Sequence, residues 1–137
     1  MKTHKAEIKK DERGTLLPLY SQDYDFDWKR CFVLKGSKEG TTRGNHGHKR
    51  ENQIMLIISG TLELESDNGK IKETIVLNED EYVVLPPLTW NTFTIKEENT
   101  VVLVMGSELF DEDEYIRDYN EFKSLICGIA IIDGGCI

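Results

Sequence analysis

The sequence predicts an all-β domain with one short helix near the C-terminus. Short segments with the apolar patterns of strands follow one another along most of the chain, and turn residues separate them. These segments are Lys5–Lys9, Thr15–Leu19, Lys29–Lys35, Gln53–Ser59, Thr61–Glu65, Lys70–Leu77, Tyr82–Leu85, Thr92–Ile95 and Val101–Gly106. With 137 residues, the chain has the length of a single ordinary domain.

Turn and strand patterns support this prediction. Ser66–Gly69 ends in Asn-Gly, a pair that favours the positive φ angles of a hairpin turn. Weaker turns are predicted at Asn78–Glu81 and Glu97–Asn99. Ile54–Ile58 is apolar on both faces, so we expect the barrel interior to cover one face and a partner sheet or subunit to cover the other.

The helix is predicted from a capping pattern and an apolar stripe. Asp111 can cap its start, with Glu114 as the reciprocal partner of a capping box. The stripe at helical spacing consists of Tyr115, Tyr119, Phe122 and Ile126. We interpret this stripe as core packing.

Charge and hydropathy exclude several classes of protein. Acidic residues outnumber basic ones 25 to 17, which disfavours nucleic acid as a partner. A local basic stretch with Arg43, Lys49 and Arg50 could still hold a compact anionic ligand. The apolar run Leu125–Ile132 is far shorter than the roughly 20 residues of a membrane-spanning helix, so no membrane association is expected.

The cysteines and the N-terminal segment predict the compartment. Cys31, Cys127 and Cys136 are odd in number and lack metal-type spacing. No secretory apolar segment follows Met1. We therefore expect a cytoplasmic protein with free thiols.

His46 and His48 form the centre of the predicted site. Residues two apart on a strand share a face, so both imidazoles point to the same side. The spacing of Gly40, His46, His48, Gln53 and Gly60 resembles the first cupin motif, in which glutamate usually stands at position 53. The resemblance implies a jelly-roll β-barrel, the double-stranded β-helix.

The second cupin motif is altered. Pro86, Leu88 and Asn91 occupy the frame of its Pro-x-Gly-x-x-His pattern, and Asp80 replaces its leading glycine. Gln53 and Asn91 thus put neutral amides at two positions where a cupin metal centre has ligands, and amides bind transition metals poorly. We expect no metal and no cofactor, and the imidazole pair suits proton abstraction and return.

A closer resemblance rests on several ordered motifs. Thr42–Lys49 resembles the Arg-Gly-x-His-x-His-Lys signature of the dTDP-sugar 3,4-ketoisomerases, the small cupins of the WxcM-like group. Similar segments are Asp11–Leu16, Asp27–Arg30, Pro86–Trp90 and Asp111–Tyr119, and the similarity covers about residues 6–122. It implies one cupin domain over residues 1–137, with the barrel at about 5–107 and the C-terminal helix and tail at 111–137.

The resemblance also implies an activity. The substrate would be a dTDP-4-keto-6-deoxyhexose, on the route to 3-amino-3,6-dideoxy sugars of bacterial surface glycans such as the O-antigen of lipopolysaccharide. A base removes the C3 proton, an enediolate forms, and a proton returns at C4, so the ketone moves from C4 to C3. The family also implies a homodimer.

Candidate residues follow from the resemblance and from side-chain chemistry. His46 and His48 are the candidate proton-transfer pair. Candidates for contacts with the substrate, including its phosphates and sugar ring, are Arg30, Arg43, Lys49, Gln53, Trp90 and Asn91. The chain departs from the family at Asn91, where histidine is common, and at Cys31–Val33, where tyrosines are frequent.

These departures keep other functions open. A related epimerase would use the same proton abstraction and leave the ketone at C4. A non-catalytic cupin would bind a sugar nucleotide as a sensor or accessory subunit, and the residues at Asn91 and Cys31–Val33 favour it. A metal-dependent dioxygenase-type cupin would need near-stoichiometric metal.

Overall fold

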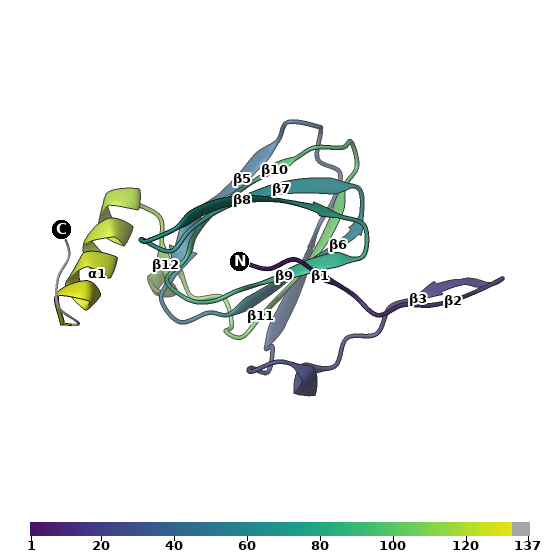
Figure 1. The fold of residues 1–137 in the computed structure, drawn as a ribbon, viewed down its shortest axis with the longest axis horizontal. Helices are drawn as coiled ribbons and strands as arrows, with labels where there is room; N and C mark the ends of the chain where they lie inside the picture. Colours follow the sequence, from purple (N-terminus) through teal and green to yellow (C-terminus); the bar gives the residue numbers. More distant parts are fainter. Residues whose placement is uncertain (133–137) are drawn as a thin grey trace.

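Two five-stranded antiparallel sheets face each other and form a β-barrel in the computed structural model, which describes residues 1–132, with side chains to residue 128 (Figure 1). The first sheet has the order β1-β9-β6-β11-β4. Its strands are β1 (His4–Lys5), β9 (Glu81–Leu85), β6 (Gln53–Ser59), β11 (Val101–Gly106) and β4 (Arg30–Leu34). The predicted cupin jelly-roll fold is confirmed.

The second sheet carries the histidine motif. Its order is β12-β5-β10-β7-β8. The strands are β12 (Tyr115–Ile116), β5 (Thr42–His48), β10 (Trp90–Ile95), β7 (Thr61–Asp67) and β8 (Lys72–Asn78). Gly69 has a φ of 91° in the turn between β7 and β8, so the predicted hairpin is confirmed.

The hydrophobic core fills the space between the sheets. Met55 and Ile57 of β6 pack there with residues of the facing sheet such as Leu64 and Phe93. Ile54 and Leu56, on the opposite side of β6, are also 0% exposed within a single chain. The burial of Ile54 and Leu56 therefore needs no second subunit, whereas Ile58 on the same side of the strand is 41% exposed.

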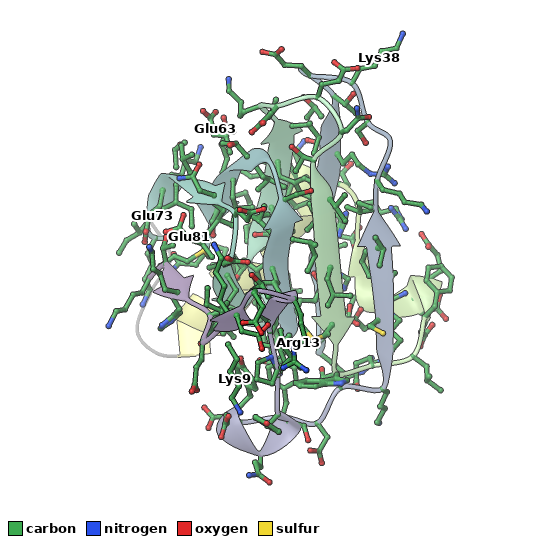
Figure 2. All side chains as sticks on the ribbon, turned by 90° about the vertical axis from the view of Figure 1, so that its right-hand side faces the viewer. Lys9, Arg13, Lys38, Glu63, Glu73 and Glu81 are labelled. Atoms are coloured by element: carbon green, nitrogen blue, oxygen red, sulfur yellow. The ribbon has the colours of Figure 1, made fainter. Side chains whose placement is uncertain are left out.

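A two-stranded hairpin stands away from the barrel. It consists of β2 (Lys9–Asp11) and β3 (Gly14–Leu16), and every residue of both strands is exposed. It projects on the side of the barrel opposite the C-terminal helix (Figure 1). Figure 2 looks at the barrel from the hairpin side, with Lys9 and Arg13 labelled on the hairpin. The predicted strands Lys5–Lys9 and Thr15–Leu19 are thus shorter and placed differently.

The C-terminal segment differs from the predicted helix. A 3-10 helix, η2 (Glu112–Glu114), comes first, then β12, and the α-helix α1 covers Tyr119–Ile132. Asp111 does cap η2, since its side chain accepts a hydrogen bond from the Asp113 amide. Glu114 does not complete a capping box, because its carboxylate is buried against His48. Residues 133–137 of the predicted tail lie outside the described part of the chain.

Two positions keep a glycine-like backbone without glycine. Asp80 has a φ of 67° and Leu88 a φ of 60°. These are the positions at which the second cupin motif carries glycine. The Leu88 amide donates to the His48 carbonyl at 2.7 Å, which holds this turn against the histidine strand. The motif geometry is therefore retained although both glycines are replaced.

Two further predictions concern membranes and thiols. In the described part of the chain, no helix has both the length and the apolar character needed to cross a membrane. Cys31 is an exposed free thiol, as predicted. Cys127 is in a disulfide, so the prediction of free thiols is wrong for this residue.

Candidate active site

A β-bulge in β5 brings Arg43 and His46 to the same face. His46 pairs with Asn91 of β10 and Gly44 pairs with Thr92, which leaves Asn45 as an extra residue. Gly44 has a φ of 90° and Asn45 a φ of 57°, a conformation that glycine and asparagine tolerate best. Residues three apart on a regular strand would face opposite sides. The bulge therefore allows Arg43 and His46 to line the same cavity.

We expect Gly44→Ala to destabilise the barrel by about 2–3 kcal/mol, because the added Cβ combines a left-handed φ with a clash. That Cβ would lie 2.8 Å from the backbone oxygen of Asn91. Gly36→Ala is the matched control, since Gly36 has a φ of 75° but nothing within 4 Å of a Cβ. Urea unfolding measures both, and equal losses would show that the close approach to β10 is unimportant.

The bulge opens onto a cavity inside the barrel. Its volume is about 250 Å³, and it is lined by Phe32, Leu34, Arg43, Gly44, His46, Gln53, Met55, Phe93, Val104, Tyr115 and Arg117. A larger depression of about 510 Å³ follows the exposed β2–β3 hairpin, but it contains no histidine and no buried carboxylate. The hairpin depression therefore lacks the acid–base groups that the barrel cavity offers.

His48 lies between two buried carboxylates. Its Nδ1 atom donates to Glu114 Oε2 at 2.8 Å, and Glu51 Oε2 lies 3.2 Å from the same nitrogen. Burial alone would raise the pKa of Glu114, but hydrogen bonds from His48 and from the amides of Arg50 and Glu51 hold that pKa below its usual value. An ionised Glu114 fixes the His48 proton on Nδ1, so Nε2 is the free base.

Glu51 connects His48 to Arg30. Its carboxylate, 1% exposed, accepts from Gln53 Nε2 at 3.0 Å and pairs with Arg30 Nη2 at 3.3 Å. The space for this carboxylate depends on Gly106, where a Cβ would lie 2.0 Å from Glu51 Oε1. Arg30 Nη2 also donates to the Tyr115 hydroxyl at 2.7 Å. The network runs from one sheet to the other across the barrel.

His46 has a different electrostatic environment. Burial lowers the pKa of His46 to about 4, and the neighbouring His48 also lowers it, while a hydrogen bond with the Gly44 carbonyl opposes the shift. The two imidazole rings are 4.9 Å apart and perpendicular. His46 is thus neutral at neutral pH, with a role in hydrogen bonding rather than as a cation.

Because the pKa of His46 is lowered in the folded protein, the free energy of unfolding should decrease as the pH is lowered. Between pH 7 and pH 5 the unfolded imidazole binds a proton near its usual pKa of about 6.5, whereas the folded one does so only near 4. The unfolded state therefore gains protons first, and about 1–2 kcal/mol should be lost over this range. Urea unfolding at both pH values should show a smaller loss for His46→Asn, and equal losses in the two proteins would contradict this origin.

The same buried groups are the candidates for holding a metal. Ligand atoms of His48, Glu51 and Glu114 lie within 4.8 Å of one another. However, His48 Nδ1 and both Glu114 oxygens make hydrogen bonds within the chain, and Glu51 pairs with Arg30. A cation would have to break this network and face the Arg30 guanidinium. The donor set fits proton transfer better than metal binding.

The structure brings some predicted residues together and separates others. Arg43, His46 and Gln53 line the cavity, and His48 contacts its wall through the His46 ring. Asn91 is buried beside His46 on the neighbouring strand. Its amide nitrogen donates to the Thr89 carbonyl, which leaves Oδ1 without a partner.

The remaining predicted contacts lie elsewhere. Trp90 does not line the cavity and packs against Tyr119 and Phe122 of α1. Lys49 donates to the Asp113 carbonyl on the surface. Arg30 is held by Glu51 and Tyr115. Arg30 and Lys49 are thus engaged within the chain.

Sequence reasoning missed four residues of the site, namely Glu51, Glu114, Tyr115 and Arg117. Three of them belong to the Asp111–Tyr119 motif, which the sequence analysis assigned to a helix. The signal was present, because β12 pairs directly with the histidine strand, with Tyr115 opposite His48. A strand of two residues has no periodicity that a sequence pattern could reveal.

Comparison with known proteins decides the family. Residues 1–127 match the family described as WxcM-like, C-terminal (FdtA). The chain belongs to this family. The TDP-4-oxo-6-deoxy-alpha-D-glucose-3,4-oxoisomerase of Aneurinibacillus thermoaerophilus is 29% identical over 123 residues, 88% of each chain. The predicted relationship to 3,4-ketoisomerases of dTDP-sugars is therefore confirmed.

Solved structures of 3,4-ketoisomerases agree with this membership of the FdtA family. A 3,4-ketoisomerase from Helicobacter canadensis is 28% identical with a TM-score of 0.86, over 91% of this chain and 96% of that one. In a Thermoanaerobacterium thermosaccharolyticum 3,4-ketoisomerase, a histidine-to-asparagine mutant was solved with TDP-4-keto-6-deoxyglucose. That structure is 27% identical with a TM-score of 0.86, over 93% and 94% of the chains. These relatives favour an isomerase over a non-catalytic cupin.

Proposed function

We propose that this chain is a metal-independent 3,4-ketoisomerase of a dTDP-4-keto-6-deoxyhexose, with His48 as the base that moves the carbon-bound proton. One observation carries the assignment of the base. His48 Nε2 is a buried nitrogen without a hydrogen-bond partner, while Nδ1 of the same ring is fixed by Glu114. A buried acceptor without a partner costs free energy, which is reasonable where a substrate supplies the missing contact.

His48 can both take and return the proton. The neighbouring carbonyl makes the C3 proton acidic, and Nε2 removes it to give an enediolate. The carboxylates of Glu51 and Glu114 stabilise the imidazolium that forms, as a buried aspartate does in a serine protease. Return of the proton at C4 completes the move of the ketone from C4 to C3.

The cavity fits the sugar rather than the whole nucleotide sugar. Its volume of about 250 Å³ is below the roughly 300–1,000 Å³ that is usual for drug-sized ligands. Arg43 and Arg117 line it, and neither is buried. We assign the diphosphate to these two guanidinium groups, in place of the sequence-based candidates Arg30 and Lys49. Arg117 pairs with the exposed carboxylate of Glu112, and the diphosphate would replace this surface partner.

The experiment is a direct assay. Purified protein is incubated with dTDP-4-keto-6-deoxyglucose, and proton NMR follows the ketone. A shift of the ketone to C3 supports the proposal. An epimerised product that keeps the ketone at C4, or saturable dTDP binding without turnover, would contradict it.

We also propose a homodimer. The hairpin and the segment before it expose Leu16 (59%) and Ile8 (41%), and Val33 on the edge strand β4 is 52% exposed. Apolar side chains on a projecting arm and on an open sheet edge are protected when two subunits exchange contacts. Light scattering should give twice the chain mass for the native protein, and a monomer at micromolar concentration would contradict the proposal.

A further inference from the structure

We infer that Tyr115 is a second catalytic residue, whose hydroxyl transfers the oxygen-bound proton while His48 transfers the carbon-bound one. This inference rests on the proposed function and adds a role for a residue that the family resemblance did not supply. It starts from a chemical requirement. Moving a ketone from C4 to C3 also requires that the C4 oxygen gains a proton and the C3 oxygen loses one.

Tyr115 carries the only hydroxyl among the described residues that line the cavity. The neighbouring strand β4 contributes Phe32 and Leu34 to the lining, neither of which can exchange a proton. His46 is a poor candidate for the acid because burial lowers its pKa to about 4, which keeps it neutral. The phenol is therefore the available group for proton transfer to oxygen.

The position of Tyr115 matches this role. Its ring centroid lies 4.4 Å from that of His48 and 5.1 Å from that of His46. The β12–β5 pairing fixes this arrangement, since Tyr115 stands directly opposite His48. The phenol thus lines the cavity, and the base lies directly beside it on the adjacent strand.

The hydrogen bonds of the hydroxyl leave its proton available. Its oxygen accepts from Arg30 Nη2 at 2.7 Å, so its own hydrogen is free to donate into the cavity. The Arg117 guanidinium lies 4.5 Å from the ring centroid. The Arg30 guanidinium donates directly to the phenol oxygen and stabilises the negative charge on it after the proton has left.

The proton balance closes with these two residues. His48 takes the C3 proton while Tyr115 gives its proton to the C4 oxygen, which produces an enediol. The phenolate then takes the proton of the C3 hydroxyl as the C3 ketone forms, and His48 returns its proton to C4. Both side chains end in their starting states, and no external acid or base is required.

The test compares Tyr115→Phe with the wild type in D2O, using dTDP-4-keto-6-deoxyglucose. Isomer formation should fall about 100-fold, with KM within about threefold. Deuterium enters C3 of the substrate when the C3 proton is removed and a deuteron returns to C3. This exchange does not require removal of the proton from the C3 hydroxyl. Isomer formation relative to this uptake should therefore fall at least about tenfold.

Several outcomes would overturn the role. Isomer formation within about threefold of wild type would do so. A proportional fall of isomerisation and C3 exchange would also do so, because Tyr115 would then play no part in removing the proton of the C3 hydroxyl. Tyr119→Phe is the matched control, because its hydroxyl bonds Asp67 outside the cavity, and we expect activity within twofold of wild type. A wild type without isomerisation or C3 exchange would instead refute the proposed function and this inference with it.

A second measurement avoids any dependence on the folding of the variant. Incorporation of 3,5-difluorotyrosine at position 115 keeps the shape of the ring and makes the hydroxyl more acidic. The alkaline limb of the kcat profile should then move to lower pH. An unmoved limb would overturn the role of Tyr115.

Discussion

His48→Asn is expected to reduce isomerisation by about 10²–10⁴-fold, because an asparagine amide cannot accept the C3 proton. Affinity for dTDP should stay within a few-fold, since the diphosphate is assigned to Arg43 and Arg117 and not to His48. The NMR assay of product formation and calorimetry with dTDP measure the two effects separately.

His4→Asn is the control for His48→Asn. His4 lies on β1 and stacks on Tyr82, outside the candidate active site. Its replacement should leave turnover within about twofold of wild type. Equal losses of turnover and dTDP affinity in His48→Asn would show that His48 is structural and that another group is the base.

Glu114→Gln is expected to lower kcat by about 10³-fold with little change in KM, because it should reverse the tautomer of His48. Glu114 Oε1 accepts the amides of Arg50 and Glu51, and Oε2 accepts His48 Nδ1. A glutamine would keep its oxygen on the two amides and turn its NH2 group toward Nδ1. Nδ1 must then accept this hydrogen bond, so the ring proton moves to Nε2. His48 then has no free nitrogen to act as the base. Nitrogen NMR of labelled histidine can report the tautomer directly.

Asp113→Asn is the matched control, since Asp113 is the neighbouring acidic residue and is exposed. We expect its kcat within about twofold of wild type. A Glu114→Gln protein with normal kcat would show that Glu51, 3.2 Å from the same nitrogen, is sufficient to orient His48.

The sequence predicted the fold well because the barrel strands carry strong local patterns. Alternation in β7 and the Asn-Gly turn after it are local signals, and they identified the hairpin correctly. What covers the outer face of β6 was harder to predict. Its apolar residues suggested a second subunit, but Ile54 and Leu56 are already buried within one chain. A sequence pattern shows that a face is covered, not what covers it.

The candidate site could be predicted only in part. Spacing on β5 placed His46 and His48 on one face, and their rings do contact each other. Glu114 was predicted to be a helix cap because its local context resembles a capping box. Its actual partner, His48, lies 66 positions earlier in the chain, and pairing at that range comes from β12 joining β5. Local patterns carry no information on such contacts.

The formal charges of the buried network around His48 favour protonation of its imidazole. In the resting site, Arg30 contributes one positive charge, Glu51 and Glu114 one negative charge each, and neutral His48 none, which leaves a net charge of −1. Transfer of a proton to His48 brings the cluster to zero. A low-dielectric interior normally opposes the charging of an imidazole. Here the two carboxylates offset the charge of the imidazolium, and Arg30 lies beside the oxygen of Tyr115 that becomes negative, so burial opposes this proton transfer less than it would around an isolated imidazole.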